Sequence, residues 1–247
     1  MRELRISLPG PSSETALGRK GERNVKVGLI YTSTTPELIE LVEREVKKQL
    51  GNDVEMLSLQ DASILAETRD AGYVTTAAAA RLIRMYMDAA CEGVDAMLNL
   101  CSSVGEVADC AQDAAKYIGV PIVRVDEEMC REAVRQGKKI AVMATLPTTL
   151  EPTKNTVLRV AREMGKHVEL VDALVEGAFG LDQDQFRARM AEVAGTVADQ
   201  VDVILFAQGS MAYCEEYIAE MFHKVVLSSP RFGAAELKKA LAAKGVL

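Results

Sequence analysis

The sequence predicts an α/β protein made of two pseudo-symmetric, flavodoxin-like βα halves, each with a parallel sheet, and a cleft between them. Two observations indicate this fold class. Apolar runs rich in β-branched residues alternate with segments of helical periodicity, and the alternation restarts near residue 138 with similar letters. The chain has 247 residues, 49% of them hydrophobic, which suffices for the core that such a fold requires.

The chain divides into an N-terminal arm and two halves. Residues 1–24 are rich in glycine, proline, serine and charge, so we expect an arm there, with at most one short strand at residues 4–8. The first half covers residues 25–137. Its periodicity predicts strands at 25–32, 53–59, 94–100 and 120–125, and helices at 36–50, 75–93 and 104–119.

The second half, residues 138–247, repeats the first. The segments 26–32, 53–59 and 94–103 recur at 139–145, 167–173 and 201–210, which is 113, 114 and 107 residues later. A looser match joins 119–123 to 223–227. Repeated βα units form parallel sheets that bind ligands beyond the carboxyl ends of their strands. We therefore expect a site in the cleft, and we expect the C-terminal helix to pack back on the first half.

Small and hydroxyl-bearing residues gather at the predicted strand ends. They are Thr32, Ser33, Thr34, Thr35, Ser102 and Ser103 in the first half, and Thr145, Thr148, Thr149, Gly209 and Ser210 in the second. Helix capping explains one residue in each loop: Thr35 before a proline, and Thr148 or Thr149. The remaining hydroxyls, with the free N–H groups of a helix start, predict a cradle for a carboxylate or a phosphate.

Cys101 stands at the end of an apolar strand, directly before two serines. Ser103 and Glu106 have the spacing of a capping box, so Cys101 is expected just before a helix N-terminus. That position favours a thiolate of lowered pKa, because the helix dipole and free N–H groups stabilise negative charge. The alternative is that Cys101 is a small buried hydrophobic residue.

The other four cysteines have helical surroundings. Cys91, Cys110 and Cys130 fit core packing beside alanine and other apolar residues. Cys214 falls near the second-half cleft, where it is either structural or a further candidate for catalysis.

Composition excludes several classes of function. The net charge of −7 and the pI of about 5.1 argue against a nucleic-acid partner. No apolar run reaches the ~18–20 residues of a membrane span, and no signal peptide precedes the first strand, so a cytoplasmic location is expected. Five cysteines without a CxxC motif do not indicate a disulfide framework, and two isolated histidines predict no metal site.

Several of these segments resemble the aspartate/glutamate/hydantoin racemase superfamily over roughly residues 25–230. They are the hydroxyl-rich loop after Tyr31, the Cys-Ser strand end at 98–103, VPIVRVDEE at 120–128, AVMATLPTTLEPT at 141–153 and VDVILFAQGSM at 201–211. The resemblance implies a cofactor-independent enzyme and a homodimer, and it matches Glu127 to an acidic residue that opens a helix.

The family mechanism implied by the resemblance uses two facing cysteines. One thiolate removes the proton α to a carboxylate and the other thiol returns a proton on the opposite face, while hydroxyls and N–H groups stabilise the enediolate. Here both the internal repeat and the family comparison place Gln208 at the second cysteine position. Glutamine cannot act as an acid or base near neutral pH, although it can donate a hydrogen bond to a substrate.

Three functional hypotheses follow. The first is a racemase-like isomerase of a small amino- or dicarboxylic acid, in which Cys101 transfers the α-proton, alone or with Cys214 in place of the missing thiol. The second is a single-cysteine decarboxylase, lyase or cis-trans isomerase of the same superfamily. The third is a protein that binds small carboxylates without catalysis.

Overall fold

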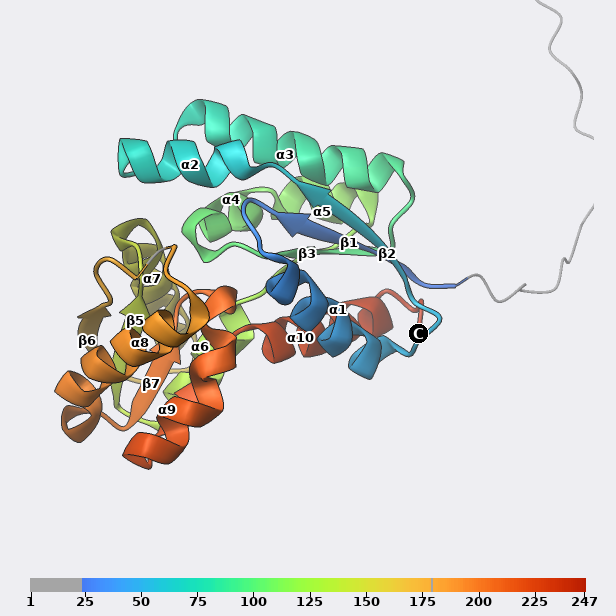
Figure 1. The fold of residues 1–247 in the computed structure, drawn as a ribbon. Coiled ribbons are helices and arrows are strands. Elements are labelled where there is room, and N and C mark those ends of the chain that lie inside the picture. The colour runs from blue at the N-terminus through green and yellow to red at the C-terminus, as the bar shows by residue number, and fades with distance from the viewer. Residues whose placement is uncertain (1–23, 179) are drawn as a thin grey trace, which may run out of the picture.

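The structure is a computed structural model that describes residues 24–178 and 180–247. It contains two four-stranded parallel sheets with the same strand order, β2-β1-β3-β4 and β6-β5-β7-β8 (Figure 1). The predicted α/β class with two pseudo-symmetric halves is confirmed. The arm at residues 1–23, including the strand considered at 4–8, lies outside the described residues.

The first half alternates strands and helices in the predicted order. Its elements are β1 (Lys26–Tyr31), α1 (Pro36–Leu50), β2 (Glu55–Gln60), α2 (Ala62–Ala71), α3 (Thr76–Cys91), β3 (Ala96–Asn99), the 3-10 helix η1 (Ser102–Val104), α4 (Gly105–Cys110), α5 (Gln112–Ile118) and β4 (Ile122–Arg124). Helix α2 was not predicted, and the helix expected at 104–119 is divided into η1, α4 and α5.

The second half repeats this arrangement. Its elements, with the helix that joins the halves, are α6 (Glu127–Gln136), β5 (Lys139–Ala144), α7 (Pro147–Glu163), β6 (Glu169–Leu174), α8 (Gln183–Val197), η2 (Ala198–Gln200), β7 (Val203–Phe206), η3 (Gly209–Cys214), α9 (Glu215–Phe222), β8 (Val225–Leu227) and α10 (Pro230–Ala243). The repeat extends to side chains at the strand starts. Asp95 accepts a hydrogen bond from the backbone N–H of Lys26, and Asp202 accepts one from Lys139.

Each sheet is covered by helices on both faces, as buried parallel sheets require. The cores of the first half place α3, α4 and α5 on one face of the sheet and α1 with α10 on the other. In the second half, α6 and α7 cover one face, and α8 and α9 cover the other.

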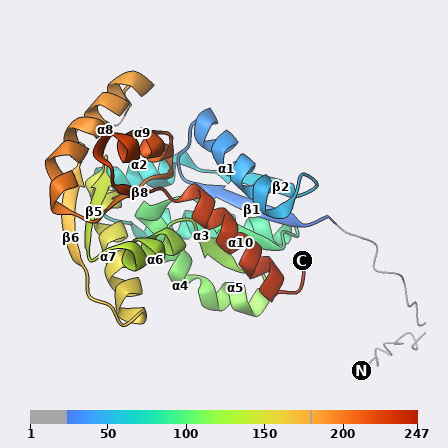
Figure 2. The same cartoon turned by 90° about the horizontal axis from the view of Figure 1, so that it is seen from below.

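The final helix of each half is exchanged with the other half. Helix α6 follows β4 but packs on the second sheet beside α7, and α10 follows β8 but packs on the first sheet beside α1 (Figures 1 and 2). The approach is close: a Cβ atom added to Gly233 of α10 would lie 2.8 Å from Cα of Val125. In terms of packing, α6 thus belongs to the second half, whose core it shares. The repeat in the sequence instead predicts that the first half extends to residue 137.

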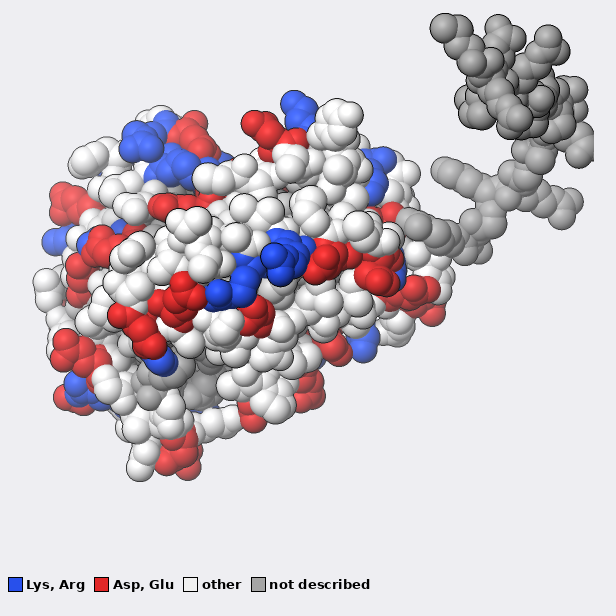
Figure 3. Space-filling model, turned by 90° about the horizontal axis from the view of Figure 1, so that it is seen from above, with Lys and Arg blue, Asp and Glu red and all other residues white. Residues whose placement is uncertain are grey.

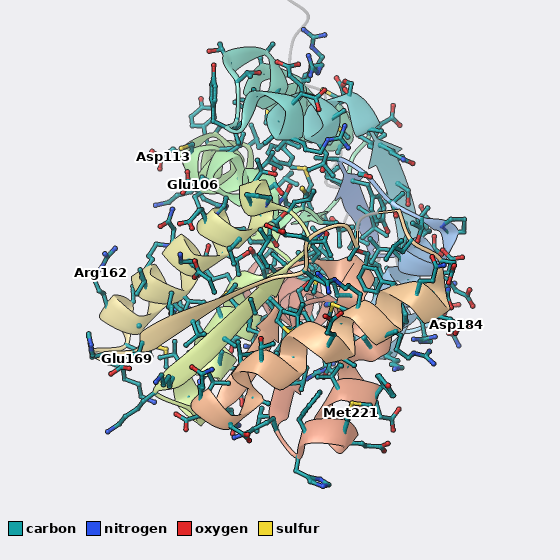
Figure 4. The ribbon with its side chains drawn as sticks, turned by 60° about the vertical axis from the view of Figure 1, so that its left-hand side comes forward. Glu106, Asp113, Arg162, Glu169, Asp184 and Met221 are labelled. Atoms are coloured by element: carbon teal, nitrogen blue, oxygen red, sulfur yellow. The ribbon has the colours of Figure 1, made fainter. Side chains whose placement is uncertain are left out.

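Two predicted helix starts are wrong. Ser103 and Glu106 form no capping box, because η1 begins first and Glu106 lies on the outer surface of the first half (Figure 4). Neither Thr148 nor Thr149 caps α7, since the N-cap residue is Leu146 and Pro147 opens the helix. Thr35 does cap α1, as its hydroxyl accepts a hydrogen bond from the N–H of Leu38.

Surface charges of both signs are interspersed on the face shown in Figure 3. Within the described part of the chain, no helix is both long enough and apolar enough to cross a membrane.

Two cysteines that were expected in the core lie at the surface. Cys91 and Cys110 are exposed, because each ends its helix on the solvent side. Cys130 is buried as expected.

Candidate active site

A cavity of about 680 Å³ lies between the halves, at the carboxyl ends of β1, β3, β5 and β7. Topology explains its position, because the loops after these strands meet where the two sheets face each other. Most of the site residues predicted from the sequence line it: Thr32, Ser33, Thr34, Thr35, Cys101, Ser102, Ser103, Thr145, Thr149, Gln208, Gly209 and Ser210.

Three predicted residues do not line the cavity. Glu127 opens α6 and forms ion pairs with Arg131 at 2.7 Å and Arg159 at 2.8 Å. Burial alone would raise the pKa of Glu127, but these two guanidinium groups hold it below its ordinary value. Thr148 lies in the first turn of α7 with a buried hydroxyl, and Cys214 is completely buried behind the cavity wall.

Cys101 is the thiol that reaches the cavity. It precedes a 3-10 helix of only three residues, so the helix dipole expected to favour a thiolate is weak. Burial raises the pKa of Cys101, while the Thr32 hydroxyl and the N–H groups of Ser103 and Val104 oppose the increase. The lowered pKa predicted from the sequence is therefore wrong, because burial shifts the pKa of this thiol upward.

Two buried polar side chains, Asn99 and Tyr86, hold the backbone of Cys101 in place through hydrogen bonds. Asn99, the last residue of β3, donates a hydrogen bond from Nδ2 to the carbonyl of Cys101 at 3.0 Å. Its Oδ1 atom accepts a hydrogen bond from the Tyr86 hydroxyl at 2.9 Å. Because both side chains are buried, this chain of hydrogen bonds fixes the direction in which β3 delivers the thiol.

A second buried anchor lies beside Ser102. Arg124 and Asp126 form a two-pronged ion pair, with Nε–Oδ1 at 3.0 Å and Nη2–Oδ2 at 2.9 Å. Burial alone would raise the pKa of Asp126, but the Arg124 guanidinium and the Ser102 hydroxyl hold it below its ordinary value. Arg124 is buried and does not line the cavity, so this ion pair supports the site from behind Ser102.

The Thr32–Thr35 loop supplies polar groups from the first half. Thr32 is completely buried and its Oγ1 has no hydrogen-bond partner among the described residues, yet it lies beside Cys101 and favours the thiolate. The loop leads into α1, a 15-residue helix whose N-terminus carries partial positive charge. Across the cleft, the hydroxyls of Ser103 and Thr149 are 2.7 Å apart and join the halves.

Gln208 occupies the position that corresponds to Cys101 in the second half. Its Oε1 atom accepts hydrogen bonds from the backbone N–H of Thr145 at 2.7 Å and from the Thr145 hydroxyl at 3.1 Å. Thr145 is itself the counterpart of Thr32, 113 residues later. The repeat therefore places a threonine beside a cysteine in one half and beside a glutamine in the other.

Comparison with known proteins was made on the whole chain. The family model described as Asp/Glu/Hydantoin racemase matches residues 27–237. This chain belongs to the Asp/Glu/hydantoin racemase family. A search of curated protein sequences finds no match.

Solved structures with the same fold include racemases of this family. Glutamate racemase from Francisella tularensis, solved with D-glutamate, has a TM-score of 0.69 at 15% identity and covers 91% of this chain and 83% of its own. Allantoin racemase from Klebsiella pneumoniae has a TM-score of 0.61 at 18% identity, covering 90% and 89%. Aspartate racemase from Picrophilus torridus has a TM-score of 0.64 at 13% identity, covering 90% and 95%.

Within the racemase family pattern, Cys214 was the candidate to replace the second thiol. The structure places its sulfur in the core of the second half, next to Tyr213 and Arg187. Burial raises the pKa of this thiol, and Cys214, unlike its neighbour Tyr213, does not line the cavity. Among the described residues, Cys101 is thus the one cysteine that lines the site.

The sequence missed much of the cavity wall. Apolar residues from α1, α2, α8 and η3 line it, as do three carboxylates and one arginine; they are Leu38, Leu41, Leu65, Phe186, Tyr213, Glu37, Glu40, Asp182 and Arg44. None of these residues follows a strand, and position after a strand is the pattern that predicts site residues in this fold.

Across residues 24–178 and 180–247, no three His, Cys, Asp or Glu side chains gather in a way that would hold a metal ion.

Proposed function

We propose that this protein is a cofactor-independent isomerase that acts on a small carboxylic acid by moving the proton α to the carboxylate, with Cys101 as the acid–base group. Membership of the racemase family supports an isomerase of this kind. The observation that carries the proposal is the position of Cys101 in the cavity, among hydroxyl and N–H donors suited to an enediolate.

The proposed reaction uses the groups on both sides of the cleft. Substrate carboxylate binds at the Thr32–Thr35 loop, and the Cys101 thiolate removes the α-proton, so that the C–H electron pair forms an enediolate. Cys101 then holds that proton as a thiol. Since Gln208 cannot supply a proton near neutral pH, the proton for the opposite face comes from water on the side of the Thr145–Gln208 pair. The hydroxide left behind takes up the proton that Cys101 releases through the solvent, and this restores the thiolate.

One observation favours a second candidate, a decarboxylase on the same scaffold. Burial raises the pKa of the Cys101 thiol, and a raised pKa favours the protonated form, which donates a proton rather than removes one. In decarboxylation the bond to one carboxylate breaks, carbon dioxide leaves, and its bonding electrons form the enediolate. The Cys101 proton then completes the new C–H bond, and water restores the thiol.

Proton exchange in deuterium oxide tests both candidates. Amino acids and substituted malonates would be incubated with the enzyme and followed by NMR for deuterium at the α-carbon and for carbon dioxide. An isomerase incorporates deuterium and racemises without loss of substrate, whereas a decarboxylase consumes a malonate. Activity should disappear in Cys101→Ala and persist in the matched variant Cys214→Ala; full activity in Cys101→Ala would refute the role of this thiol.

The proposal also covers the oligomeric state of the protein, its location and its independence of metal ions. We expect a cytoplasmic homodimer, which light scattering coupled to gel filtration can test. We also expect activity to survive exhaustive treatment with a chelator, and loss of activity that added metal restores would contradict the mechanism.

A further inference from the structure

We propose that the substrate carries a single carboxylate and a bulky apolar group, so that aspartate and glutamate are poor substrates for this protein. This inference rests on the proposed function, because it assumes that the carboxylate binds near Cys101. It concerns the remainder of the cavity, where the substituent on the α-carbon must lie.

Part of the cavity wall, contributed by α8, η3 and the segment before α8, is apolar and aromatic. Phe186 and Tyr213 form a ring pair with centroids 5.6 Å apart, and both line the cavity. Tyr213 is 38% exposed and Leu181 is 39% exposed, so apolar surface faces the open space. Leu38 and Leu65 extend this surface from α1 and α2. Exposed apolar surface within a cavity is typical of a binding site for an apolar group.

The charges around the cavity disfavour a second carboxylate. Three lining residues, Glu37, Glu40 and Asp182, are acidic, and Arg44 is the one lining cation among the described residues. The Arg44 side chain is 56% exposed and lies 3.8 Å from a carboxylate oxygen of Glu45. An exposed cation of this kind contributes little binding free energy, and like charges facing a second carboxylate would oppose it.

In the second half, the polar groups of Thr145 and Gln208 already bond to each other. The backbone N–H and hydroxyl of Thr145 both bond to the Gln208 side chain, whose oxygen takes the place that a carboxylate oxygen would need. Their counterpart in the first half, the Thr32 hydroxyl, has no hydrogen-bond partner among the described residues. A carboxylate at the Thr32–Thr35 loop therefore displaces no hydrogen bond of the Thr32 hydroxyl, whereas a carboxylate at Thr145 must first break the bonds to Gln208.

The size of the cavity agrees with a bulky ligand. Small-molecule sites span about 300–1,000 Å³, and this cavity of about 680 Å³ falls in the middle of that range. A substrate of four or five carbons would leave most of the apolar wall in contact with water. A phenyl or branched alkyl group would cover it.

Calorimetric titration with 3-phenylpropionate and with succinate tests the inference. The two ligands share a carboxylate and a two-carbon chain and differ in the terminal group, phenyl or carboxylate. We expect 3-phenylpropionate to bind with a Kd about tenfold lower or more, in line with the discrimination that apolar pockets achieve. Tighter or equal binding of succinate, or no binding of either ligand, would overturn the inference.

A matched pair of variants locates the effect. Leu181→Arg places a cation on the apolar wall and should reduce the preference for 3-phenylpropionate at least fivefold. Leu158→Arg is the control, because Leu158 is 41% exposed but lies on α7 outside the cavity. An unchanged preference in Leu181→Arg would refute the assignment of the wall. If the proposed function is wrong but the inference is right, the protein will catalyse no proton exchange with any carboxylate and will still prefer 3-phenylpropionate in the binding assay.

Discussion

Replacement of Thr32 by valine isolates the influence of one hydroxyl on the Cys101 thiol. Valine has nearly the same shape, and Thr32 Oγ1 has no hydrogen-bond partner among the described residues that the change would leave unsatisfied. The side chain is completely buried at the end of β1, so the fold should tolerate the variant. Loss of the hydroxyl removes a group that favours the thiolate, and the pKa of Cys101 should therefore rise further.

The magnitude follows from the strength of a hydrogen bond to a charged group, about 1.5–3 kcal/mol. Since 1.36 kcal/mol corresponds to a factor of ten in the ionisation equilibrium, Thr32→Val should raise the pKa of Cys101 enough to be measured. The N–H groups of Ser103 and Val104 remain and limit the change. At a fixed neutral pH, the thiolate fraction and the alkylation rate should fall about tenfold or more.

Alkylation by iodoacetamide as a function of pH measures this directly when mass spectrometry assigns the modified site. Thr145→Val is the control, because Thr145 is the counterpart of Thr32 but bonds to Gln208 instead of the thiol. Its alkylation midpoint should match that of the wild type. A midpoint that stays constant or moves to lower pH in Thr32→Val would refute the role assigned to this hydroxyl.

Three further predictions concern the groups around Cys101. Asn99→Leu should lower kcat far more than it changes KM and cost about 1–3 kcal/mol of unfolding free energy in urea, since buried partners lose their hydrogen bonds; an unchanged kcat would contradict a positioning role. Gly105→Ala should lower Tm, because the added Cβ would lie 2.5 Å from Arg124 Cζ, whereas Gly195→Ala, which meets ordinary contacts in a helix, should maintain or raise Tm. The lowered pKa of Asp126 contributes stability that is complete above the unfolded pKa near 3.9 and is lost as pH falls through the folded value. Acid titration of unfolding should therefore be shallower in Asp126→Asn, and an equally steep loss in this variant would exclude the carboxyl as a source.

The sequence was sufficient for the strands and for the repeat, because both depend on local patterns, but it did not predict α2 or the division of the helix expected at 104–119. The strands at 26–31 and 139–144 follow from runs rich in β-branched residues. The equivalent position of these two strands in their sheets follows from the repeat. The exchange of α6 and α10 was only half expected. An amphipathic helix shows that one face is buried, but the pattern does not state which sheet covers it.

The site was predictable where it depends on strand ends and not elsewhere. Thr32, Cys101 and Gln208 follow directly from the topology, since parallel strands deliver their following residues to one edge. Phe186 and Leu65 come from helices, where an apolar residue looks the same whether it faces a core or a cavity. Asn99 could have been predicted as a site residue, because it is an amide within an otherwise apolar strand.

The exchanged helices determine when each half can become complete during synthesis. The core around β1 and β3 contains Ala234, Leu237 and Leu241 of α10, which leave the ribosome after every strand of both sheets. The core of the second half contains α6, which emerges before any strand of that half. During synthesis, one face of the first sheet is therefore covered by α1 alone until α10 emerges and completes that core.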